Sequence, residues 1–226
     1  MIKHFFYLLL FSTLLISCND HGKLNNELKN DSTTLNKLDT SITNSYVYKS
    51  EQEQLKRKRA LCKKLALYDL ENGTDEFELR IWLIPSMWDP SILYILKGKD
   101  TTWTLFHYQY YTMRATALNH YYDSPNVDSV IMESVRPQKT NWQTYIDNLQ
   151  LDSLWNLKTE SEIKGKSFGV FDGHRYIVEF SNKGKYKYLF YTTPEYFKDK
   201  DDNHKKFIEF QKRLIDPIVY NGMRNP

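Results

Sequence analysis

The sequence predicts one α+β domain, built from an antiparallel meander sheet with helices packed mainly on one face. Two observations lead to this fold class. Several segments with strand-like patterns follow one another directly, without the strand–helix alternation of a parallel sheet. Turns that contain glycine, as hairpins often do, separate some of these segments. Residues 49–226 also have the length of a single domain.

The first expected element is a helix over residues 51–71. Ser50 and Glu53 have the spacing of a capping box, and Asn72-Gly73 can end the helix in a left-handed turn. The basic run at positions 56–59 is expected to be a solvated face, with contact to anionic lipid headgroups as the alternative. Apolar residues recur at helical spacing within this segment: Leu55, Cys62, Leu65 and Tyr68.

Strands and two more helices are expected after this helix. Apolar and polar residues alternate over residues 77–83, as in a strand that is buried on one face. Further strands are expected over residues 92–97, 102–112 and 127–136. A second helix begins at Thr140 and continues, after a kink, through residues 154–157. The last helix begins near residues 201–203 and ends at Asp216-Pro217.

The final hairpin is predicted to its register. Strands 175–180 and 185–192 flank Asn182-Lys183-Gly184. A three-residue loop with Gly184 as a left-handed bulge residue would pair Ser181 with Lys185 and place Glu179 opposite Lys187. This register would also gather the aromatic residues of both strands on one face.

The start of the chain has the layout of a secretory signal. Lys3 and His4 precede an apolar run over residues 5–16, which is shorter than the roughly 20 residues that a membrane span needs. The run ends in Leu15-Ile16-Ser17-Cys18, which resembles the lipobox of bacterial lipoproteins at all four positions. This resemblance implies cleavage before Cys18 and attachment of acyl chains such as palmitate to Cys18. It places the protein at the cell membrane or outer membrane, with its domain in the periplasm or at the cell surface.

The chain therefore divides into three parts. Residues 1–17 form the lipoprotein signal peptide, residues 18–48 the lipidated cysteine with a flexible tether, and residues 49–226 the globular domain. The tether is rich in Asn, Ser and Thr. The abundance of Asn, Lys, Ile and Tyr in the whole chain resembles a Bacteroidota-like composition. Leu28, Leu35 and Ile42 fall seven residues apart, so a short coiled coil is the alternative for this segment.

Charge and cysteine content narrow the classes of partner. The formal net charge of +3 is too small to indicate nucleic-acid binding. Of the two cysteines, Cys18 is expected to carry lipid, which leaves Cys62 as a buried thiol without a disulfide partner in the chain.

No motif assigns a catalytic residue, a metal ligand or a cofactor. The stretch Gly165-Lys166-Ser167-Phe168-Gly169 matches a nucleophile elbow, but a polar segment precedes the serine and a hairpin follows it. Asp199, Asp201 and Asn203 start like a calcium loop, yet His204 stands where the turn glycine is needed. The sequence thus favours a domain without enzymatic activity, expected to hold no cofactor.

The aromatic content, 15% of the chain with 17 tyrosines, is the remaining clue to function. Trp82, Arg175 and Tyr191 are the candidate binding residues, because the strand patterns place them on outward faces; aromatic pairing within the sheet is the alternative. The leading hypothesis is a protein-binding lipoprotein, for example an immunity-type inhibitor of an exported toxin. The alternatives are a carbohydrate-binding or glycan-utilisation accessory lipoprotein, and a hydrolase with an unrecognised site.

Overall fold

The computed structural model describes residues 46–85, 90–112, 127–163 and 173–220. The predicted signal peptide, Cys18, the predicted tether up to residue 45 and the Gly165–Gly169 motif lie outside these residues. Within them, no helix is long and apolar enough to cross a membrane.

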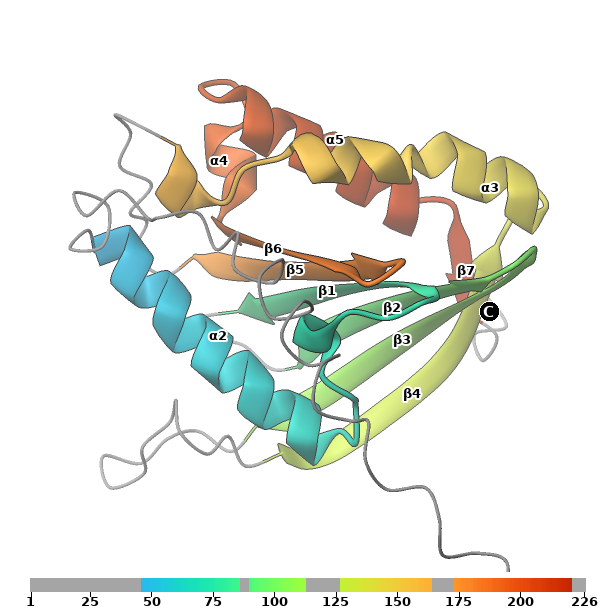
Figure 1. The fold of residues 1–226 in the computed structure, drawn as a ribbon, viewed down its shortest axis with the longest axis horizontal. Coiled ribbons are helices and arrows are strands. Elements are labelled where there is room, and N and C mark those ends of the chain that lie inside the picture. Colours follow the sequence, from blue (N-terminus) through green and yellow to red (C-terminus); the bar gives the residue numbers. More distant parts are fainter. Residues whose placement is uncertain (1–45, 86–89, 113–126, 164–172, 221–226) are drawn as a thin grey trace, which may run out of the picture. The chain divides into compact units, whose positions relative to one another are not determined.

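The described residues form an α+β domain around one antiparallel sheet, which confirms the predicted fold class (Figure 1). The spatial order is β6-β5-β1-β2-β3-β4-β7, so β1 to β4 form the expected meander. The hairpin β5–β6 extends the sheet beside β1, and short β7 pairs with the end of β4. The strands are β1 (Phe77–Pro85), β2 (Ser91–Lys99), β3 (Thr102–Thr112), β4 (Val127–Pro137), β5 (His174–Asn182), β6 (Lys185–Thr192) and β7 (Ile218–Tyr220).

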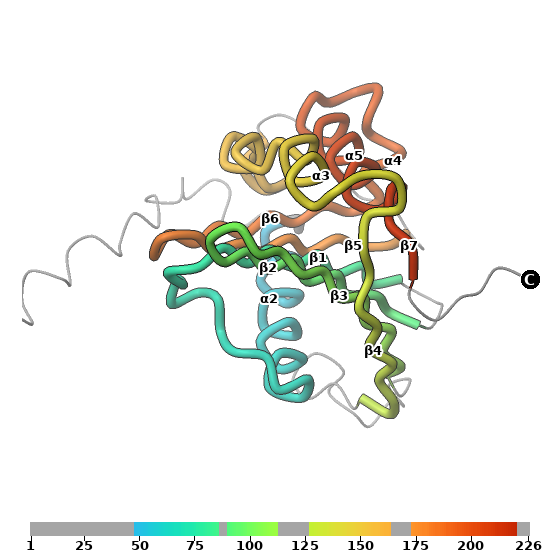
Figure 2. The backbone as a smooth tube through the Cα atoms, turned by 90° about the vertical axis from the view of Figure 1, so that its right-hand side faces the viewer, coloured from blue at the N-terminus to red at the C-terminus, as the bar shows by residue number. Residues whose placement is uncertain are grey.

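Among the described elements, three α-helices lie on one side of the sheet and one lies on the other, so both faces are covered (Figure 2). Helix α2 (Tyr46–Lys64) lies on one side, as Figure 2 shows with the sheet seen nearly edge-on. On the other side lie α3 (Trp142–Leu149), α4 (Pro194–Phe197) and α5 (Asp202–Ile215). Three short 3-10 helices complete the fold: η1 (Leu70–Asn72), η2 (Leu151–Asn156) and η3 (Glu160–Glu162).

The helix ends differ in detail from the sequence prediction. Helix α2 begins earlier than expected, at Tyr46. It also ends earlier, because Ala66 has a positive φ of 53° and the chain turns there. The kink after α3 is confirmed at Gln150, which adopts a left-handed conformation. Helix α5 also begins as predicted, because the Asp201 carboxylate accepts hydrogen bonds from the backbone N–H groups of Asn203 and His204.

Two hydrophobic cores result, one on each side of the sheet. The larger lies under α3 and α5 and includes Phe180, Phe207 and Leu214. The smaller lies under α2 and includes Leu61, Cys62 and Trp82. The prediction that Cys62 is buried is confirmed, and it is a free thiol within the described residues. Burial raises the pKa of this thiol to about 11.

The face under α2 also buries a charged network. Lys58 forms ion pairs with Glu71 at 2.9 Å and with Glu179 at 3.4 Å, while Arg80 binds Glu78 at 2.6 Å. The prediction of a solvated face at positions 56–59 is therefore wrong for Arg57 and Lys58, which are both buried. In a sheet with one exposed face, the polar side chains of β1 and β5 on that face would be solvated. Here α2 covers this face, and its basic side chain Lys58 pairs with the Glu179 carboxylate of β5.

The predicted register of the last hairpin is wrong by one residue. Asn182 pairs with Lys185 across a two-residue turn, in which Lys183 and Gly184 both have positive φ. Two residues with positive φ are what a type I′ hairpin turn requires. Glu179 consequently faces Tyr188 instead of Lys187. The prediction assumed one aromatic face, but helices bury both faces, so aromatic residues occur on each.

Candidate functional site

The structure does not bring Trp82, Arg175 and Tyr191 together on a surface. Trp82 is buried under α2, where its indole N–H donates to Glu179 Oε2 at 3.0 Å. Tyr191 is buried on the opposite face and stacks on Phe207, with ring centroids 4.6 Å apart. Arg175, in β5, is partly buried and pairs with Ile84 of β1. Trp82 and Tyr191 are therefore core residues, one on each side of the sheet.

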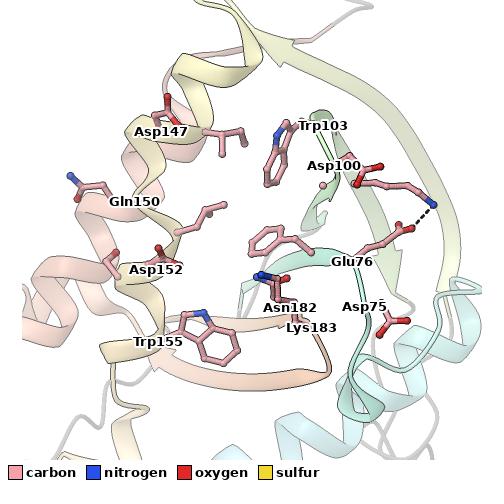
Figure 3. A pocket seen from close by; sticks show the side chains of 16 residues that line it. Asp75, Glu76, Asp100, Trp103, Asp147, Gln150, Asp152, Trp155, Asn182 and Lys183 are labelled. Atoms are coloured by element: carbon pink, nitrogen blue, oxygen red, sulfur yellow. Dashed lines mark ion pairs between the residues drawn. The ribbon is translucent and has the colours of Figure 1, made fainter.

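An open cleft of about 830 Å³ lies elsewhere, at the end of the sheet where hairpin turns meet the α3–η2 segment. Figure 3 shows the two sides of this cleft. Asp147, Gln150, Asp152 and Trp155 come from α3 and η2 on one side. The start of β1 and the β2–β3 and β5–β6 turns form the opposite side.

Aromatic rings form the walls of the cleft, and the core holds them in place. Trp103 lies edge-on against Phe77, with centroids 5.7 Å apart. Gly98 leaves room for this indole, because a Cβ at position 98 would lie 2.3 Å from the Trp103 ring. Across the cleft, Trp155 lies edge-on against Phe180 at 4.5 Å. The walls are thus preformed, which lowers the entropic cost of binding a ligand.

The rim of the cleft is acidic, although the whole chain is slightly basic. Five carboxylate residues line the cleft (Asp75, Glu76, Asp100, Asp147 and Asp152), against two lysines, Lys99 and Lys183. Lys99 Nζ forms an ion pair with Glu76 Oε1 at 2.6 Å, so one of the two lysines is already paired. A net negative cleft on a chain of charge +3 attracts positively charged groups in preference to negative ones.

The lining carries no group suited to nucleophilic catalysis by histidine or cysteine. None of the described residues around the cleft is of either type. In the described part of the chain, no cluster of His, Cys, Asp and Glu could hold a metal ion. The geometry suits binding: flat apolar walls, amides at Gln150 and Asn182, and carboxylates around the opening.

The histidines that the structure describes have structural surroundings. His204 is buried, and its two ring nitrogens contact Asp201 at 2.9 Å and Glu160 at 3.2 Å. His107 is buried in the sheet between the rings of Tyr94 and Tyr220, and this burial lowers its pKa. His174 is partly exposed and pairs with Glu195 at 2.8 Å, away from the residues that line the cleft.

Glu51 predicts a pH dependence of stability. It is buried on α2, its Oε1 accepts a hydrogen bond from the Thr159 hydroxyl at 2.7 Å, and burial raises its pKa from 4.5 to about 7. The folded state therefore keeps a proton that the unfolded state releases above about pH 4.5. This contribution to stability is full below pH 4.5 and is lost as the pH rises through about 7.

We expect Glu51→Gln to remove this loss. At pH 8 the variant should be more stable than the wild type by up to about 3 kcal/mol, while at pH 4 the two should be similar. Urea unfolding at several pH values measures the difference. Glu53→Gln, exposed on the same helix, is the control and should leave the pH dependence unchanged. Parallel pH profiles for wild type and Glu51→Gln would contradict the assignment.

The sequence prediction missed the cleft because its lining comes from separate segments. Two of its turns, Gly98-Lys99-Asp100 and Asn182-Lys183-Gly184, could be recognised as turns. Their shared location depends on β5 pairing with β1, which places both turns at one end of the sheet.

Comparison of the chain with protein-family models, curated proteins and solved structures finds no match, so its function is inferred from its own residues.

Proposed function

We propose that the protein is an envelope lipoprotein, anchored through Cys18, whose domain binds a protein partner without catalysis. The cleft at the turn end of the sheet is the proposed contact site. The observation that carries this proposal is the combination of preformed aromatic walls with an excess of carboxylates around the opening. Anchoring through Cys18 rests on the lipobox resemblance and places this binding domain at a membrane.

A basic segment of the partner fits this cleft best. The aliphatic stem of a lysine or arginine can lie on Trp103 or Trp155, and its charge can reach Asp147 or Asp152 at the rim. An immunity-type inhibitor that covers a basic patch of an exported toxin is one form of this function. Charge complementarity of this kind speeds association and selects among partners.

Glycan binding is the second candidate, and the aromatic walls favour it. Sugar rings stack on flat indole faces, and the amides of Gln150 and Asn182 could hydrogen-bond to hydroxyl groups. A neutral sugar gains little from the carboxylate excess. The two candidates therefore differ in the salt dependence that they predict, since ionic strength screens exposed charges.

Two probes distinguish the candidates: a lysine- and arginine-rich peptide, and an N-acetylglucosamine tetramer. For the protein-binding function we expect the peptide to bind, more weakly at higher salt. Its affinity should fall about tenfold in Asp147→Asn/Asp152→Asn, because two exposed ion pairs contribute about 1 kcal/mol or less each. Asp216→Asn, exposed outside the cleft, is the matched control and should bind normally.

The remaining outcomes favour other functions. Salt-independent binding of the sugar, lost in Trp155→Ala, would support the glycan candidate and overturn the protein-binding one. If neither probe binds, or if the double variant binds the peptide as the wild type does, the cleft is not the proposed site.

A further inference from the structure

The two edges of the sheet are protected to different extents. At the β6 edge, side chains of the η3 region satisfy outward backbone N–H groups. The Phe190 N–H donates to the Thr159 hydroxyl at 2.9 Å, and the Thr192 N–H donates to the Glu160 carboxylate. At the other edge, β7 pairs with β4 through three residues only, Val135, Arg136 and Pro137. Within the described residues, no strand pairs with the outer edge of residues 127–133.

This open part of β4 carries three consecutive exposed apolar residues. Val130, Ile131 and Met132 are 44%, 49% and 56% exposed. Neighbouring residues of a strand point to opposite faces, so β4 exposes apolar side chains on both of its faces here. Figure 1 shows β4 at the margin of the sheet, away from α5. The inner edge of the same residues is paired with β3, so the strand is already formed.

An exposed apolar edge strand is normally blunted by lysine, proline or a covering segment, because it can pair with another chain. Residues 127–133 contain no lysine, arginine or proline. They contain two carboxylates, Asp128 and Glu133, which flank the apolar centre. A second copy of this strand would add two more carboxylates to the same interface, and like charges on adjacent strands destabilise the pair. A strand with basic flanks is complementary.

We propose that the outer edge of β4 takes up an extended segment of a partner protein as an additional strand. The segment would carry apolar side chains at its centre and lysine or arginine at its ends. Backbone hydrogen bonds to β4 would supply affinity, and Asp128 and Glu133 would select the basic flanks. This surface lies outside the residues that line the cleft, so it does not depend on the function proposed for the cleft.

The experiment uses the full chain in mild detergent and a labelled peptide, Lys-Val-Thr-Val-Thr-Val-Lys. Fluorescence anisotropy should show saturable binding of this peptide. The counterpart with glutamate at both ends should bind at least tenfold more weakly. In the variant Asp128→Lys/Glu133→Lys, this preference should reverse. The cleft variant Asp147→Asn/Asp152→Asn is the matched control and should retain the wild-type preference, which separates this inference from the proposed function.

A second measurement tests strand addition itself and keeps the side chains constant. Two peptides are used, one N-methylated at the odd-numbered residues and one at the even-numbered residues. A methylated amide cannot donate a backbone hydrogen bond, so the methylated edge of each peptide cannot pair with β4. At least one of the two peptides should therefore lose binding. Undiminished binding of both N-methylated peptides, no preference between basic and acidic ends, or no binding of the unmethylated peptide would overturn the proposal. A dimer in light scattering that Ile131→Lys converts to monomer would also overturn it, in favour of a second copy at this edge.

Discussion

Replacing Glu179 with alanine is expected to lower the free energy of unfolding by about 3–5 kcal/mol, because it breaks a buried ion pair and leaves a buried indole N–H without its acceptor. Glu179 is fully buried; its carboxylate pairs with Lys58 and accepts the indole N–H of Trp82. Burial raises the pKa of Glu179, and the nearby charges of Lys58 and Arg80 act against this rise. Glu179 of β5 therefore connects to α2 through one ion pair and to β1 through one hydrogen bond.

Urea unfolding at pH 7 measures this loss, and two other variants calibrate it. Glu76→Ala removes the exposed partner of Lys99 and should change the stability far less, because exposed ion pairs contribute little. Glu179→Gln retains an acceptor for Trp82 but not the charge, so its cost should lie between the other two. A cost for Glu179→Ala as small as that of Glu76→Ala would mean that the buried network does not hold α2 on the sheet.

The second large effect is expected at Cys18. Cys18→Ser removes the thiol that the lipobox resemblance designates for acylation, so the protein should carry no lipid. Two or more acyl chains hold a protein stably on a membrane, since each buried CH₂ contributes about 0.8 kcal/mol. We expect the wild type in the membrane fraction with an acylated residue 18, and the variant without incorporated palmitate.

Intact mass and radiolabelled palmitate measure acylation directly. Cys62→Ser is the matched control, because Cys62 is buried in the core under α2 and should not affect lipid attachment. An acylated Cys18→Ser protein, or a wild type that starts elsewhere and carries no lipid, would contradict the anchoring part of the proposed function.

These two predictions rest on different kinds of information. Cys18 is found from a contiguous motif of four residues, and no tertiary structure enters that inference. Glu179 could be placed on a strand from its neighbours, but its role depends on Lys58 of α2, which is 121 positions away. Alternation in β1 correctly predicts a strand, yet Trp82 was expected on an outward face and is buried. The period of a strand shows which residues share a face, and does not show what covers that face.

Turns illustrate the same limit. Lys183 and Gly184 were recognised within a turn, but a two-residue and a three-residue loop both satisfy the local sequence. The three-residue loop was predicted because it gathers the aromatic residues on one face, and burial of both faces removes that criterion. Local periodicity, capping residues and turn residues by themselves determined the strands of the meander, the α5 helix and the α+β class, because these depend on neighbours along the chain. Only the tertiary structure decided the covering of both faces, the hairpin register, the acidic cleft and the open edge of β4. Each of these requires segments far apart in the sequence to meet, and no local preference encodes which segments do so.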